Sequence, residues 1–157
     1  MATRTPGNPW RQTHMGYWLA QASARFDARV LALMAANDSM PLALANLAAR
    51  GHLTASHVHI TRHLALAGSR LTELAARAGV SKQAMGKLVD QCEAWGLVQR
   101  QCDLRDARAC LVVFTPTGLS WLQAFKEAVT QAQNELQDAV GQEVATVMAL
   151  GLEAYAA

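Results

Sequence analysis

The sequence lacks the features that mark several common classes of protein. Its three cysteines are an odd number, so a disulfide framework is not expected. No apolar run reaches the roughly 20 residues of a membrane span, because the best stretch, residues 28–36, is interrupted by Arg29. The first residues contain no apolar core of a secretory signal. We therefore expect a cytoplasmic protein with no membrane partner.

Motifs of catalysis are also missing from the chain. It has no glycine-rich phosphate loop, no nucleophile elbow, and no cluster of histidine, cysteine and acidic residues at catalytic spacing. The sequence thus predicts no catalytic residue, no metal and no cofactor, and it indicates a protein that is not an enzyme. A pocket that gathered several titratable groups with shifted pKa values would favour the enzyme alternative.

Charge is distributed unevenly along a chain that is otherwise rich in alanine and leucine. Basic residues outnumber acidic ones by six to two over residues 1–69 and by seven to five over residues 70–116. Residues 117–157 hold one basic and five acidic residues. A basic front and an acidic tail suggest a polyanionic partner on one side of the molecule.

The pattern of apolar residues and helix breakers predicts seven helices and one hairpin. The helices are expected over residues 13–36, 41–50, 54–67, 72–78, 81–95 and 115–138, with a last one after Gly141 to about residue 155. Two β-rich runs, 97–101 and 110–115, are separated by a charged loop over 102–109. On the first helix, one apolar stripe is expected from Leu19, Phe26, Val30 and Leu33. The fold class is therefore mainly α (α+β).

A short helix, a glycine-containing turn and a second helix run from Leu71 to Asp90, which is the pattern of a helix-turn-helix. Gly79 permits the turn, and Ser81 is expected to cap the second helix. The buried face of that helix is predicted to hold Ala84, Leu88, Cys92 and Trp95. Its opposite face is predicted to present Lys82, Gln83, Gly86, Lys87 and Asp90.

The exposed face has the chemistry of a DNA-reading helix. Gln83 suits an adenine edge, while Lys82 and Lys87 suit phosphate or guanine. Ser81 offers a hydroxyl and helix N-terminal amides to a phosphate, and Gly86 would allow close approach of the backbone. The alternative is the ordinary polar face of an amphipathic helix.

The hairpin that follows strengthens the DNA-binding interpretation. Its loop is expected to expose Arg105 and Arg108, which suit a narrow minor groove of high negative potential. Asp103 and Asp106 could pair with these arginines and support the wing. The alternative, a solvated charged turn, does not explain why the arginines come directly after the helix pair.

The sequence resembles the MarR family of winged helix-turn-helix regulators. The resemblance is carried by residues 71–90, by Gly96-Leu97-Val98, by Asp103 with Asp106-Ala107-Arg108, by Phe114-Thr115-Pro116-Thr117-Gly118 and by Leu53-Thr54-Ala55-Ser56-His57. It implies a dimer built from the terminal helices, major-groove contacts by the recognition helix, minor-groove contacts by the wing, and relief of repression by a small ligand. The domains are then a loose arm (1–12), N-terminal dimerisation helices (13–52), the winged helix-turn-helix (53–116) and C-terminal dimerisation helices (117–157).

The residues of the C-terminal helices also point to a homodimer. Leu122, Phe125, Val129, Ala132 and Leu136 follow the spacing of a helix packed along another helix. Val140, Val144, Val147 and Met148 continue an apolar face. A monomeric helical bundle is one alternative. A winged helix kept for protein contacts is another, but its surface would carry exposed aromatics rather than lysine and arginine.

A small aromatic or acidic effector is predicted to bind between the DNA-binding part and the dimer helices. Its pocket is expected to include Tyr17, Trp18, His57, His59 and His63. His59 and His63 also have the i, i+4 spacing of a metal site, but the later helices offer no further histidine or cysteine at such a spacing. The sequence therefore favours an effector over a metal.

The cysteines divide into one core residue and one pair. Cys92 occupies an apolar position of its helix and is predicted to be inert. Cys102 and Cys110 flank the wing loop almost symmetrically, so a redox-controlled bridge is one hypothesis. Their spacing alone does not establish that they face each other.

Overall fold

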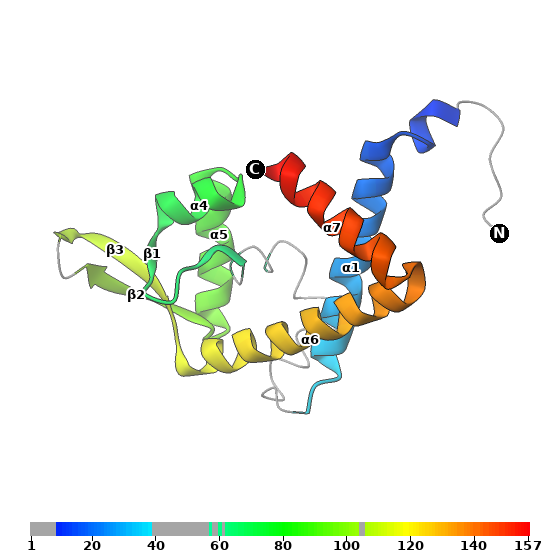
Figure 1. Cartoon of the computed structure of the whole chain (residues 1–157). Coiled ribbons are helices and arrows are strands. Elements are labelled where there is room, and N and C mark those ends of the chain that lie inside the picture. Colours follow the sequence, from blue (N-terminus) through cyan, green and yellow to red (C-terminus); the bar gives the residue numbers. More distant parts are fainter. Residues whose placement is uncertain (1–8, 39–56, 58–59, 61, 104–105) are drawn as a thin grey trace.

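The computed structural model describes residues 9–38, 57, 60, 62–103 and 106–157. The predicted helix over 41–50 and most of that over 54–67 fall outside these residues. The described helices are η1 (Pro9–Gln12), α1 (Met15–Ala35), α4 (Leu71–Ala78), α5 (Lys82–Ala94), α6 (Pro116–Val140) and α7 (Gln142–Ala156). With a small sheet they confirm the mainly helical fold and its winged helix-turn-helix (Figure 1).

Three short strands form the sheet of the wing. They are β1 (Ser69–Arg70), β2 (Val98–Asp103) and β3 (Asp106–Phe114), in the antiparallel order β1-β3-β2. The predicted hairpin is confirmed, but its strands are longer than expected, and residues 104–105 alone join them. Strand β1 was not predicted, because a strand of two residues is too short to show the alternation of apolar and polar side chains. The hairpin projects away from the helices (Figure 1).

Helix α1 packs against α6 and is joined to it by polar contacts. Arg29 forms two hydrogen bonds of 2.7 Å with the Glu135 carboxylate, and Asn37 donates to Glu127 at 3.1 Å. The hydrogen bonds from Arg29 and then Gln131 lower the pKa of Glu135 to about 2.

The apolar stripe predicted on α1 is partly wrong. Val30 and Met34 are buried, Phe26 and Leu33 are half-buried, and Leu19 is exposed, so the contact lies toward the C-terminal half of α1.

One continuous hydrophobic core links α1, the helix-turn-helix, the sheet and α6. On α5 the buried residues are Met85, Val89 and Cys92. The predicted stripe was therefore rotated, because Ala84 is exposed while Leu88 and Trp95 are half-buried. Burial raises the pKa of the Cys92 thiol to about 12, so this cysteine is unreactive, as predicted.

The start of α6 lies unusually close to the first residues of the wing. Thr115 caps α6 by accepting the Gly118 amide at 3.0 Å, and its own amide donates to the Leu97 carbonyl at 3.1 Å. A Cβ atom on Gly118 would lie 1.9 Å from that carbonyl oxygen. Only glycine fits this position, because any side chain would push α6 away from the sheet.

Large apolar side chains remain exposed on the terminal helices. On α7 and at its junction with α6 they are Val140, Val144, Val147, Met148, Leu150, Leu152 and Tyr155. Trp10, Met15 and Trp18 are exposed near the start of the described chain. Among the described residues, none of the helices has the combination of length and apolar character needed to cross a membrane.

Candidate nucleic-acid interface

The turn between α4 and α5 has the geometry predicted from the sequence. Gly79 ends α4 in the left-handed region, with φ 66° and ψ 28°, which favours glycine. The Ser81 hydroxyl oxygen accepts the Ala84 amide at 3.1 Å and so caps α5. The Ser81 hydroxyl hydrogen remains available for donation to an external acceptor. This turn exposes the first residues of α5 at one end of the helix pair.

The N-terminal half of α5 presents unengaged polar side chains to solvent. Lys82, Gln83 and Lys87 are exposed, and within the described part of the chain no hydrogen bond or ion pair engages their side chains. Two ammonium groups and a carboxamide therefore point outward from a single helix surface. This arrangement suits contact with phosphates and with base edges.

Gly86 does not lie at the centre of this surface. It is half-buried, and a Cβ atom built on it would lie 3.9 Å from the Leu71 side chain at the start of α4. A Cβ atom would therefore make an ordinary contact with α4, and this packing does not require glycine. A role in close backbone approach to DNA stays a prediction from the sequence.

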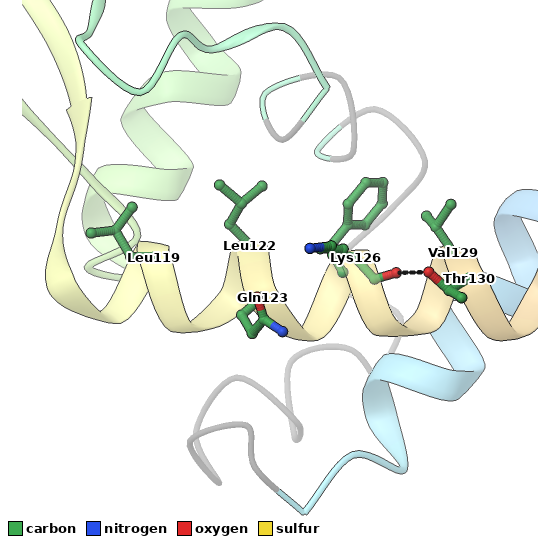
Figure 2. Close-up of a pocket in the computed structure, with 7 residues that line it drawn as sticks. Leu119, Leu122, Gln123, Lys126, Val129 and Thr130 are labelled. Carbon is green, nitrogen blue, oxygen red and sulfur yellow. Dashed lines mark hydrogen bonds between the residues drawn. The ribbon is translucent and has the colours of Figure 1, made fainter.

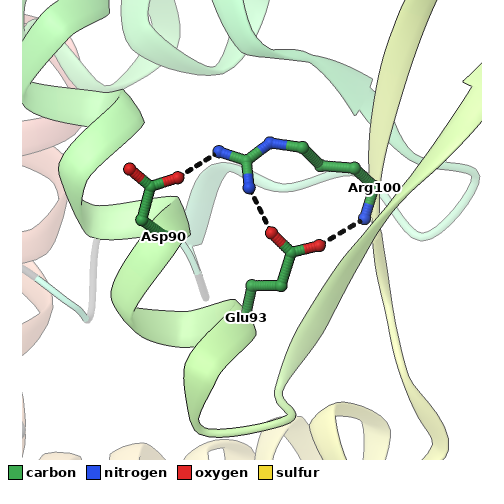
Figure 3. A network of polar contacts seen from close by, with 3 residues as sticks. All are labelled: Asp90, Glu93 and Arg100. Atoms are coloured by element: carbon green, nitrogen blue, oxygen red, sulfur yellow. Dashed lines mark hydrogen bonds and ion pairs between the residues drawn. The ribbon is translucent and has the colours of Figure 1, made fainter.

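Asp90 is exposed on α5, as predicted, and it also belongs to an ion-pair network (Figure 3). Arg100 of β2 reaches back to α5, where one of its nitrogens lies 2.5 Å from the Asp90 carboxylate and another contacts Glu93. The Arg100 backbone amide also donates to Glu93 at 3.0 Å. The hydrogen bond to Asp90 is the largest of the effects that raise the pKa of Arg100. The network fastens the base of the wing to the last turns of α5.

This network was missed by sequence reasoning. The available sign was an i, i+3 pair of acidic residues on α5, followed by an arginine soon after the wing begins. Asp90 was predicted only as an outward residue, because helical periodicity alone cannot show that the following strand returns to that side.

The wing carries the predicted residues, but their side chains fall largely outside the described part. Arg105 lies outside the described residues. Arg108 lies within β3 rather than in a loop, and Asp103 is the register partner of Asp106. The proposed support of the arginines by these two aspartates is therefore still a prediction.

The helix pair and the wing are also the part of the chain that matches a known family. Residues 53–109 match the model of the MarR family. The MarR resemblance of the sequence is thereby confirmed. This match agrees with the prediction that the protein is not an enzyme. A search of curated protein sequences finds no match.

Solved structures extend the MarR-family likeness to nearly the whole chain. The transcriptional repressor CouR bound to a 23-mer DNA duplex shares 20% identity, with a TM-score of 0.68, over 99% of this chain and 100% of that one. A MarR-family regulator from Rhodococcus sp. RHA1 shares 18% identity, with a TM-score of 0.69, over 97% and 96% of the two chains.

A third similar structure is the MarR-family protein Rv2887 from Mycobacterium tuberculosis in complex with p-aminosalicylic acid. It shares 22% identity, with a TM-score of 0.63, over 92% of this chain and 100% of that one. At such identities the likeness establishes a shared MarR-type fold.

The predicted effector residues are divided between two clusters. Tyr17 packs edge-on against Trp18, with ring centroids 5.1 Å apart, near the start of α1. His57 is buried against α5, where its Nε2 donates to Gln91 Oε1 at 2.8 Å and its ring lies 4.7 Å from Trp95. His63 is described, and its carbonyl accepts from Arg77, whereas His59 lies outside the described residues. No described contact therefore connects Tyr17 and Trp18 with His57, although the sequence predicted them in one pocket.

The described residues form a different hollow, along α6 (Figure 2). Its volume is about 470 Å³, and it is lined by Leu119, Leu122, Gln123, Phe125, Lys126, Val129 and Thr130. The sequence predicted Leu122, Phe125 and Val129 only as part of a helix-packing stripe, and all seven lining residues belong to α6. No group of three potential metal ligands occurs among the described residues, and the histidine pair cannot be tested there because His59 is outside them.

Proposed function

We propose that the protein is a homodimeric transcription regulator that binds a specific operator in double-stranded DNA and acts as a repressor released by a small aromatic or acidic ligand. Such a protein acts in the cytoplasm, where bacterial DNA lies. The observation that carries the proposal is the exposed N-terminal half of α5, with its unengaged Lys82, Gln83 and Lys87.

Each residue of this surface is assigned a contact. Gln83 donates to and accepts from an adenine edge in the major groove, and the two lysines neutralise phosphates or bind guanine. Ser81 donates its remaining hydroxyl hydrogen to a phosphate. Arg105 and Arg108 extend the contact into the adjacent minor groove through the wing. The Arg100 network supports this arrangement, because it ties the base of the wing to α5.

A dimer places two such surfaces on one duplex. The exposed apolar side chains of α7 and of the α1 end supply a surface that a second copy would cover. Two recognition helices related by a two-fold axis read half-sites about one helical turn apart, and the paired contact gives a short helix adequate affinity.

The hollow along α6 is the proposed effector site. Its walls are mainly aliphatic and aromatic, and the Lys126 ammonium supplies a positive charge, while the Gln123 amide donates to Glu127 at 2.9 Å. These groups suit an aromatic carboxylate, which is the kind of ligand named in the structure of Rv2887. The hollow also adjoins the start of α6, beside the wing, so a ligand there could change how the wing is held.

Selection from a pool of random duplexes tests the proposal directly. The full chain should enrich an inverted repeat, and Gln83→Ala should relax the preference at one base pair of each half-site, by about 1–3 kcal/mol. Gln133→Ala, the same change on the exposed surface of α6, is the matched control and should leave the motif unchanged. Failure to enrich any duplex at low salt would refute DNA binding, and an identical motif for Gln83→Ala would refute the assigned contact.

Release by ligand is tested with the duplex so obtained. Aromatic carboxylates should lower the affinity of the wild-type chain for DNA. Lys126→Ala should require a higher ligand concentration for the same release while it binds DNA normally in the absence of ligand. Equal ligand sensitivity of the two proteins would exclude Lys126 from the effector site.

A further inference from the structure

The wing contains two cysteines at directly opposed positions. Cys102 of β2 and Cys110 of β3 are register partners in the antiparallel pair, and theirs is the last regular pair before the register shift next to Asp103. Their sequence positions alone did not establish this opposition, because the register shift makes the hairpin asymmetric beyond this point.

The hydrogen bonds around the sheet define the class of this pair. The Thr115 amide donates to the Leu97 carbonyl, so these opposed residues form a hydrogen-bonded pair. Pairs alternate in class along an antiparallel ladder. The Arg100 amide agrees with this alternation, because it turns away from β3 and donates to Glu93. Counting along the register, the pair of Cys102 and Cys110 is non-hydrogen-bonded.

This class of pair is the one that a disulfide can bridge. Opposed Cβ atoms lie roughly 4.5–5.5 Å apart and are closest in non-hydrogen-bonded pairs. A disulfide requires a Cβ separation of roughly 3.5–4.5 Å. The backbone positions of Cys102 and Cys110 therefore permit a bridge after only a small approach of the two strands.

Accessibility separates this pair from the third cysteine. Cys110 is exposed, whereas Cys92 is buried in the core. A dissolved oxidant can therefore reach Cys110 without opening the fold, while Cys92 is shielded. A disulfide at an exposed site is also open to reduction by dissolved thiols, which makes it reversible.

We propose that Cys102 and Cys110 form a reversible intramolecular disulfide across the wing, with a low-molecular-weight disulfide as oxidant. The Cys110 thiolate attacks one sulfur of the oxidant, forms a mixed disulfide and releases one small thiolate. The Cys102 thiolate then attacks the Cys110 sulfur and releases the second. Two protein thiols are oxidised, one small disulfide is reduced to two thiols, and the protons of the protein thiols pass to solvent or to the released thiolates.

The bridge would act on the proposed DNA contact. It draws β2 and β3 together immediately before the residues that join them, among which is Arg105. A shift at this position displaces the wing from its fit in the minor groove, so we expect a several-fold loss of operator affinity. This consequence rests on the proposed function, whereas the bridge itself does not.

The chemical step is tested on the full chain by intact-mass measurement. The protein is equilibrated with mixtures of glutathione and glutathione disulfide, and remaining thiols are then alkylated in the folded state. We expect the wild type and Cys92→Ala to lose two hydrogen atoms and both alkylation sites of the wing as the disulfide fraction rises, and to recover them in dithiothreitol. Cys102→Ser and Cys110→Ser should form no intramolecular bridge.

The outcomes distinguish the two claims. Persistence of both wing thiols at the highest disulfide fraction, or bridges only between two copies of the chain, would overturn the proposal. Unchanged operator affinity of a protein shown by mass to be bridged would overturn its consequence for DNA binding. Absence of DNA binding in both redox states would refute the proposed function and leave the mass result standing.

Discussion

The recognition lobe, made of α4, α5, β2 and β3, differs from the helical lobe, made of α1, α6 and α7, in what it leaves exposed. In the recognition lobe Lys82 and Lys87 are exposed and unengaged in the described structure. In the helical lobe Arg29 is bound to Glu135, and the exposed surface of α7 is largely apolar. The first lobe thus offers charge to a polyanion, and the second offers apolar area to another protein surface.

The same contrast runs along α5 itself. Its first turns expose a carboxamide and two ammonium groups, whereas its later residues are committed to the fold through Cys92 in the core and through Asp90 and Glu93 with Arg100. One helix can serve as reader and as scaffold because these tasks fall on different turns. The surface that we propose to read DNA therefore ends where the wing is attached to α5.

The largest effect is expected at the junction of the two lobes. Gly118→Ala should destabilise the chain by about 3 kcal/mol, because the new Cβ atom would collide with the Leu97 carbonyl oxygen. Gly151→Ala is the matched control on α7, where a Cβ atom meets no neighbour within 4 Å. It should be neutral or stabilise by up to about 1 kcal/mol. Urea unfolding of both variants measures the difference, and equal stabilities would contradict the close contact.

The apolar surface of the helical lobe is tested by adding a charge to it. Val147→Glu should shift the protein from dimer to monomer in sedimentation or light scattering, because a carboxylate would be buried without a partner. Gln142→Glu adds the same charge at the start of α7 and should leave the dimer intact. A Val147→Glu protein that stays dimeric would place the dimer contact elsewhere.

The wing arginine that is predicted to bind DNA is tested against a paired arginine of the helical lobe. Arg108→Ala should weaken operator binding and reduce the slope of log affinity against log salt by about 1, if Arg108 binds a phosphate. Arg29→Ala removes the same charge from an arginine held by Glu135 and should change neither quantity. Equal behaviour of the two variants over several salt concentrations would rule out a wing contact.

The smallest effect is expected at the ion pair between α1 and α6. The pKa of Glu135 is lowered to about 2 in the folded chain, whereas an unfolded glutamate has a pKa of about 4.3. The stabilisation is therefore present above the unfolded pKa and is lost as the pH falls through the folded pKa. Arg29→Gln should flatten the fall in urea midpoint over this acid range. Arg11→Gln, on η1, should retain the wild-type profile; a steeper fall for Arg29→Gln would contradict the assignment.

Local chemistry made much of the recognition lobe predictable. Gly79 and Ser81 act within one turn of their own positions, so their roles in the turn and the cap could be assigned from neighbouring residues alone. The outward positions of Lys82, Gln83 and Lys87 follow from the period of one helix. These assignments hold because the interacting groups are close in sequence.

The remaining features depend on which elements meet. Sequence periodicity could not show that Arg100 returns to Asp90, that β1 joins the sheet, or that Cys102 lies opposite Cys110. Nor could it show that the predicted effector residues separate while α6 borders a hollow. The sequence by itself determined the helix pair, its caps and its outward chemistry, since these rest on contacts within a few residues. The tertiary structure alone decided the strand register and the ion-pair network, because each depends on which surfaces of separate helices and strands meet.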